Sequence, residues 1–276
     1  MMPLWALPLW SGLVLIVAGC EPYRRHAEYG MGESECPPGA QWDGLRCVRP
    51  VECPAGSRLE DDRCVALAPA PSASSPDPIV GAFTVAGARP DGATYTGDAA
   101  VTALAQGGPY KVVWTVAGSS YGGIATKRGD ILSVGWGDDG HGVVDFVAKG
   151  DGTLDGVWYD GKSLAPGRET LVGGLPNLAG VYTIEKGIGP SGDAYSGSCD
   201  LAVTGELHVL MWHVGKDTFR GLGIRSGDVL SVGFSTAASG AFGVVQYRIQ
   251  GNKLVGRWGE WSQKVPTLGS ETLTHK

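Results

Sequence analysis

The sequence predicts an all-β protein that ends in two tandem, small antiparallel β-barrels of about eight strands each, with β-sandwiches as the alternative. Three observations lead to this prediction. Short segments that alternate apolar and polar residues are separated by turn residues over most of the chain. Glycine is frequent, at 45 of 276 residues, without the period of collagen. A long stretch of the pattern also occurs twice, which indicates a duplicated domain.

The chain begins with an uncharged apolar segment, residues 1–19, that ends directly before Cys20. Such a segment with small residues at its end is typical of a signal peptide. The ending Val17-Ala18-Gly19-Cys20 resembles the lipobox of bacterial lipoproteins. This resemblance implies cleavage before Cys20 and a palmitate-type lipid anchor on its thiol, and hence a lipoprotein of the bacterial cell envelope, on the outer membrane and facing the periplasm or the cell surface. The segment differs from the lipobox pattern in lacking Lys and Arg near its start, so an uncleaved anchor or an ordinary buried segment is the alternative.

A cysteine-rich stalk, residues 20–65, follows the signal peptide. Cys36 and Cys47 are eleven residues apart, and Cys53 and Cys64 repeat this spacing within the same C-P-x-G motif. Four cysteines allow three pairings, and the repeat favours Cys36 with Cys47 and Cys53 with Cys64. We expect disulfide bonds because an exported segment this small cannot bury enough surface to fold without them. Zinc would be the competing use, but the C-x2-C spacing of zinc sites is missing, so we expect no metal.

Residues 66–78 are rich in Pro, Ala and Ser and have no periodic apolar face, so they are predicted to form an extended linker. The two copies of the duplicated domain follow at 79–173 and 178–276. Their closest match is RGDILSVGW at 128–136 with SGDVLSVGF at 226–234. In both, Gly129 or Gly227 supplies a turn, and the large apolar residues then fall on one face of a strand, with Ser and Gly on the other.

Eight alternating segments follow one another in the first copy. They lie near Ala82, Tyr95, Lys111, Tyr121, Ile131, Val143, Leu154 and Glu169. Eight short strands with near-sequential turns suit an up-and-down barrel, in which closure removes the exposed sheet edges. A sandwich uses the same alternation, so the order of the segments leaves both architectures open.

Both copies share the motifs G-x-[YF]-x-[VI], Y-x-G, W-x-V, G-D-x-L-S-V, G-V-V, L-x-G-x-W and E-T-L. This set resembles a glycine-rich β-domain that occurs singly or in tandem in exported bacterial proteins, most of them uncharacterised and some labelled fibronectin-binding. The resemblance covers the chain from residue 80 onward. It implies a fold and no active site.

Catalytic motifs of the G-x-S-x-G, P-loop or H-E-x-x-H type are absent, so we expect no enzyme and no cofactor. The net charge of −6 comes without a basic stripe, so we expect no nucleic-acid partner. We therefore predict a membrane-anchored lipoprotein that acts as a non-enzymatic binding or adhesion module for an unknown protein. Two copies would raise its avidity. The alternative is a carrier of a small apolar ligand in an avidin- or lipocalin-like barrel cavity.

Aromatic side chains are the candidates for ligand contacts, because they can line the mouth of a barrel. The same rings could instead simply fill the narrow interior of eight strands. The set comprises Trp114, Trp136, Trp158, Trp212, Trp258 and Tyr121.

Three further features have simpler explanations. Arg128-Gly129-Asp130 matches an adhesive tripeptide, but the second copy has Ser226 in place of Arg128, which favours a hairpin turn. Asp138-Asp139-Gly140-His141 offers possible metal ligands, but the matching loop has no titratable group, which favours a solvated turn. Cys199 is left over from the stalk pairings and is expected to be a buried thiol.

Overall fold

The structure is a computed structural model, and it describes residues 38–42, 47–48, 53–54, 57–60, 63–66, 77–138, 140–236, 240–261 and 268–276. The chain divides into two compact units, Met1–Ser72 and Ala73–Lys276. The predicted signal peptide at 1–19, the lipidation site Cys20 and most of the linker at 66–78 lie outside the described residues. In the ranges given above, no helix is long and apolar enough to cross a membrane.

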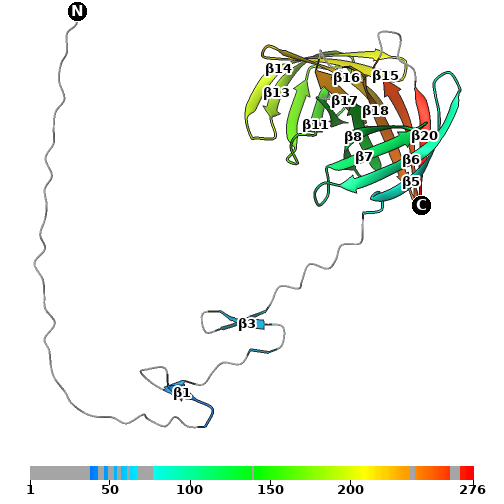
Figure 1. The fold of residues 1–276 in the computed structure, drawn as a ribbon. Coiled ribbons are helices and arrows are strands. Elements are labelled where there is room, and N and C mark those ends of the chain that lie inside the picture. The colour runs from blue at the N-terminus through cyan, green and yellow to red at the C-terminus, as the bar shows by residue number, and fades with distance from the viewer. Residues whose placement is uncertain are drawn as a thin grey trace, which may run out of the picture. The chain divides into compact units, whose positions relative to one another are not determined.

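The first unit contains two short antiparallel hairpins (Figure 1). They pair β1 (Gln41–Trp42) with β2 (Cys47–Val48), and β3 (Ser57–Glu60) with β4 (Arg63–Ala66).

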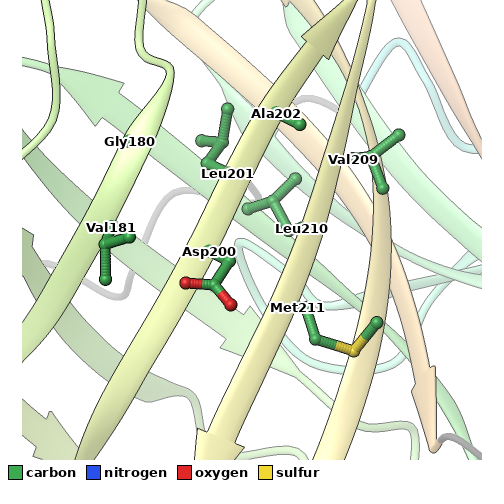
Figure 2. A pocket seen from close by; sticks show the side chains of 8 residues that line it. All are labelled: Gly180, Val181, Asp200, Leu201, Ala202, Val209, Leu210 and Met211. Atoms are coloured by element: carbon green, nitrogen blue, oxygen red, sulfur yellow. The ribbon is translucent and has the colours of Figure 1, made fainter.

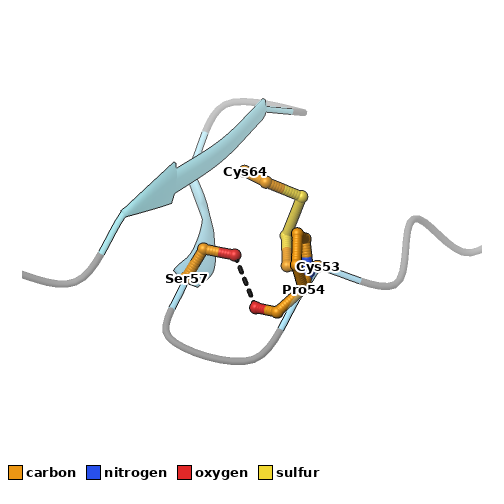
Figure 3. The surroundings of a disulfide bond; sticks show 4 residues. All are labelled: Cys53, Pro54, Ser57 and Cys64. Atoms are coloured by element: carbon orange, nitrogen blue, oxygen red, sulfur yellow. Dashed lines mark hydrogen bonds between the residues drawn. A yellow bond between two sulfur atoms is a disulfide. The ribbon is translucent and has the colours of Figure 1, made fainter.

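A disulfide bond joins Cys53 to Cys64, whose Cα atoms are 5.4 Å apart (Figure 3). Inside the closed loop the Ser57 hydroxyl donates a hydrogen bond of 2.7 Å to the carbonyl oxygen of Pro54. The predicted pairing of Cys53 with Cys64 is therefore confirmed. Cys47 is also disulfide-bonded, while its expected partner Cys36 lies outside the described residues.

The second unit is built from strands β5 to β20, each antiparallel to its neighbours. All eight segments expected in the first copy are strands. The bounds are β5 (Gly81–Ala88), β6 (Thr94–Ala103), β7 (Tyr110–Val116), β8 (Ser119–Arg128), β9 (Ile131–Gly137), β10 (His141–Ala148), β11 (Thr153–Tyr159), β12 (Gly167–Val172), β13 (Gly180–Ile188), β14 (Ala194–Thr204), β15 (Leu207–Val214), β16 (Asp217–Ser226), β17 (Val229–Thr236), β18 (Phe242–Gln250), β19 (Lys253–Glu260) and β20 (Gly269–His275).

These strands close into two eight-stranded barrels, so the barrel prediction is confirmed over the sandwich. The first barrel has the order β18-β19-β20-β5-β6-β7-β8-β9, and Figure 1 shows β20, β5 and β6 side by side in it. The second barrel runs from β10 to β17 in chain order. Each barrel therefore combines five strands of one copy with three strands of the other.

This exchange of strands differs from the expectation that each copy, 79–173 or 178–276, closes on itself. Strand β9 pairs with β18, which places Val134 opposite Val245, and β10 pairs with β17, which places Val144 opposite Val232. The two crossover segments are hydrogen-bonded to each other, because Asp138 N donates to Ala241 O at 3.0 Å. The sequence pattern does not decide this pairing, because β10 and β18 carry the same G-V-V motif and either could lie beside β9.

The barrels pack against each other through the Ser and Gly face of the repeated strand. The hydroxyls of Ser133 and Ser231 lie 2.5 Å apart and share a buried hydrogen bond. A Cβ atom at Gly135 would overlap the carbonyl oxygen of Gly142, so only glycine permits this approach of the two backbones. Strands β9 and β17 are consequently buried on both faces, one inside their own barrel and one against the other barrel.

Candidate functional site

Each barrel holds one buried glutamate among its apolar side chains. Glu169 on β12 is 6% exposed in the second barrel, and Glu271 on β20 is 4% exposed in the first. The alternation of the strand places each glutamate on the same face as a buried leucine, Leu171 or Leu273. A carboxyl group in such a place is costly unless donors surround it, so the surroundings of these two groups define the candidate site.

In the second barrel, three aromatic side chains hold Glu169. Trp212 Nε1 donates to Oε1 of Glu169 at 3.1 Å, and the Tyr195 hydroxyl donates to Oε2 at 3.2 Å. Trp158 Nε1 in turn donates to the Tyr195 hydroxyl at 3.0 Å. Strands β11, β14 and β15 supply these rings, so residues of both sequence copies converge on one carboxylate.

The first barrel builds a similar arrangement with one additional hydroxyl group, and in it Trp258 Nε1, the counterpart of Trp158 Nε1, is buried without a hydrogen-bond partner among the described residues. Tyr95 donates to Oε2 of Glu271 at 3.1 Å, as Tyr195 does to Glu169. Tyr247 stands where the second barrel has Phe146, and its hydroxyl donates to Oε1 of Glu271. Trp114 Nε1 therefore donates to Tyr247 at 3.2 Å rather than directly to the glutamate. The tyrosine hydroxyl bridges the tryptophan and the carboxylate.

Burial dominates the electrostatics of both groups. It raises the pKa of Glu169 to about 7, and the hydrogen bonds from Tyr195 and Trp212 offset this effect only in part. Burial also raises the pKa of Glu271. A carboxyl group with a pKa near neutral pH changes its charge under physiological conditions, so the charge inside the second barrel depends on pH.

We expect that substitution Tyr247→Phe lowers the free energy of unfolding by about 1 kcal/mol, because it removes the hydroxyl that accepts from Trp114 Nε1 and donates to Glu271. The loss stays small because the second barrel, with Phe146 at this position, has its tryptophan donating directly to the glutamate. Urea unfolding followed by tryptophan fluorescence measures this loss. Tyr121→Phe is the matched control, since Tyr121 is 40% exposed and the second copy has Phe219 at this position. Equal losses in the two variants would contradict a bridging role for the Tyr247 hydroxyl.

The structure divides the predicted aromatic set between the two barrels. In the first barrel Tyr121 stacks on Trp114, with ring centroids 5.2 Å apart, and lies 5.9 Å from Trp136. Trp258, also in the first barrel, packs edge-on against Tyr95. Trp158 and Trp212 contact Glu169 or Tyr195 in the second barrel. Trp114 and Trp212 are buried, whereas Tyr121 is the most accessible member of the set.

The adhesive tripeptide is engaged within the molecule. Arg128 forms a 2.8 Å ion pair with the buried Asp145, and Asp130 pairs with Arg248. Gly129 has a φ of 57°, as the predicted turn requires. Arg128 therefore links the first barrel to Asp145 of the second, whereas the pair of Asp130 with Arg248 lies within the first barrel.

The remaining candidate residues also have internal contacts. His141 Nδ1 lies 2.7 Å from the carbonyl oxygen of Asp138, and Asp139 lies outside the described residues. The described part of the chain contains no group of three His, Cys, Asp or Glu side chains placed to hold a metal ion. Cys199 is a fully buried free thiol, and burial raises its pKa above the ordinary value.

An apolar hollow of about 370 Å³ lies on the outer wall of the second barrel, over β13, β14 and β15 (Figure 2). Val181, which is 69% exposed, lies across from Asp200, and Asp200 lies across from Met211. Ala202 and Val209 form the next pair along the same two strands. The first copy has Ala82 and Lys111 at the positions of Val181 and Val209, so the equivalent surface of the first barrel is less apolar.

Sequence reasoning missed the two glutamates and the apolar hollow. The E-T-L repeat was recognised as the mark of a strand, although the alternation already turns its glutamate inward. The run LHVLMWHV at 207–214 is apolar on both faces, and this was the signal for the hollow. Comparison with protein families, with curated proteins and with solved structures finds no match to this chain.

Proposed function

We propose that this protein is a lipid-anchored, exported binding module without catalytic activity, which presents its double barrel to a partner protein in the bacterial cell envelope. The observation that carries the proposal is the state of the two glutamates. Each is a buried carboxyl group in its barrel, yet its two oxygens already accept hydrogen bonds, from Tyr195 and Trp212 for Glu169 and from Tyr95 and Tyr247 for Glu271, and it is only 6% or 4% exposed. We therefore expect a partner protein to bind on the outer walls of the two barrels.

The anchor part of the proposal rests on the resemblance of Val17-Ala18-Gly19-Cys20 to a lipobox and on the disulfide-closed hairpin that follows. Metabolic labelling with palmitate tests it. The wild-type protein and a Cys53→Ser control are expected to carry the label, and Cys20→Ala is expected to lose it. Equal labelling of Cys20→Ala would refute the anchor.

We place the partner surface at the apolar hollow because its lining gathers apolar side chains, among them Val181, Val209 and Met211, and because Val181 is 69% exposed. A photo-crosslinking amino acid at position 181 tests this in the producing cells. We expect an adduct with one envelope protein from position 181 and none from position 82, the equivalent site on the first barrel. An adduct of twice the protein's own mass, or none at all, would count against a partner protein.

The second candidate function is that of a carrier for a small apolar ligand, and the position of the Tyr121 ring favours it. This ring is 40% exposed and covers Trp114, whose indole leads to the Glu271 network, so its displacement would open an aromatic site. Titration with an apolar fluorescent dye separates the two proposals. Saturable binding at one site that Tyr121→Ala changes would support the carrier, whereas the binding module predicts no saturable uptake.

A further inference from the structure

A second hollow, of about 440 Å³, lies on the outer wall of the second barrel beside its junction with the first. Strands β10 to β13 form its floor. One row of residues across these strands is Val147, Asp155, Thr170 and Lys186. The next row contains Val157, Arg168 and Ile188, and Arg128 of β8 lines the hollow from the first barrel. We call this site the basic hollow.

Four cations line the basic hollow, and carboxylates neutralise only two of them. Arg128 is paired with Asp145 at 2.8 Å, and Lys149 is paired with Asp155 at 3.0 Å. Within the residues that the structure describes, Arg168 and Lys186 make no ion pair. The carboxyl group of Glu169 does not compensate them, because it faces the barrel interior and bonds to Trp212 and Tyr195. The basic hollow therefore has an excess of two positive charges.

This accumulation is particular to one barrel of a chain whose net charge is −6. Glu169 lies opposite Gly187 and Glu271 opposite Gly87, so Arg168 corresponds to Ser270 and Lys186 to Ala86. Ser226 takes the place of Arg128. The equivalent surface of the first barrel lacks these three cations and instead has Arg248 and Arg257 at the positions of Val147 and Val157. Both arginines are paired with carboxylates, Arg248 with Asp130 and Arg257 with Glu206, so the unpaired positive charge is particular to the second barrel.

We propose that the basic hollow binds a phosphate monoester. The planar guanidinium of Arg168 can hold two phosphate oxygens at once, and Lys186 adds a point charge. A phosphate monoester carries close to two negative charges at neutral pH, which matches the two uncompensated cations. Val147, Val157 and Ile188 lie between and beside the cations, and they offer apolar contact to the organic part of the ester. The site is separate from the proposed partner site at the apolar hollow: the two share only β13, where the apolar hollow is lined by Gly180 and Val181 and the basic hollow by Lys186 and Ile188.

The test uses the purified full-length protein and two probes that carry the same group. Phenyl phosphate represents a soluble ester, and phosphatidylcholine vesicles containing phosphatidic acid represent a lipid headgroup. Calorimetric titration is expected to show binding to at least one probe that weakens as salt is added. Arg168→Gln and Lys186→Gln are each expected to weaken it by about tenfold or more, from the loss of one charge-assisted contact.

Lys253→Gln is the matched control, since Lys253 is an exposed lysine of the first barrel that makes no ion pair in the described residues. It is expected to bind like the wild type. Arg168 and Lys186 are exposed, so unchanged thermal unfolding of both variants is expected and separates lost binding from lost folding. Binding to vesicles alone would assign the phosphate to a lipid, and binding to phenyl phosphate alone would assign it to a soluble ester. Binding to neither probe, or equal binding by all variants, would overturn the proposal.

Discussion

Substitution Glu169→Gln is expected to remove a loss of stability that the wild-type protein suffers between pH 4 and pH 8. Burial raises the pKa of Glu169 from 4.5 to about 7, so between these values the folded protein binds more protons than the unfolded chain. Under this condition the free energy of unfolding falls as pH rises, by about 3 kcal/mol in total, and it levels off above pH 7. A glutamine side chain does not titrate in this range, so residue 169 no longer makes the free energy of unfolding depend on pH.

Urea unfolding at a series of pH values measures the difference between variant and wild type. Taking this difference cancels the contributions of Glu271, whose raised pKa acts in the same direction, and of His208, whose lowered pKa acts in the opposite one. We expect the difference to move in favour of Glu169→Gln as pH rises from 4 to 8. Glu185→Gln, on an exposed position of β13, is the control and should track the wild type. Parallel curves for Glu169→Gln and the wild type would show that burial does not shift this carboxyl group.

The barrel architecture was predictable because alternation, turn glycines and the duplication all agree along the chain. The exchange of strands was not, since β10 and β18 are equivalent in pattern and the choice between them depends on the contact between barrels. The aromatic rings illustrate the consequence. Trp258 of the second copy lies in the same barrel as Trp114 of the first, so grouping the rings by copy would have assembled the wrong set.

The candidate sites differ in how much of them the sequence could reveal. The inward position of Glu169 was readable from the spacing to Leu171, while its donors come from strands that only the topology brings together. The basic hollow was beyond sequence reasoning for the same reason. Its cations are far apart in the chain, and Arg128 reaches the site only because the other barrel packs beside it.

Substitution Gly135→Ala is expected to destabilise the protein by about 3 kcal/mol or more, the upper range for overpacking at a site that cannot relax. The added methyl group would overlap the carbonyl oxygen of Gly142, which belongs to the backbone of the other barrel. Neither strand can move aside easily, because β9 and β10 are each held by neighbours on both sides. Gly233 makes the equivalent approach to Gly243, so Gly233→Ala should behave in the same way.

Gly122→Ala on β8 is the matched control, since a Cβ atom there would have its closest neighbour at an ordinary distance, 3.7 Å from the carbonyl oxygen of Val112. Its expected effect is within about 1 kcal/mol, because alanine also reduces the freedom of the unfolded chain. Urea unfolding compares the variants, and equal effects would mean that the barrels can separate at little cost. A large loss of unfolding free energy that is confined to the variants at Gly135 and Gly233 would instead establish that the two barrels form one folding unit. The Ser and Gly face of the repeated strand, which includes Ser133 and Ser231, would then be the surface that joins them.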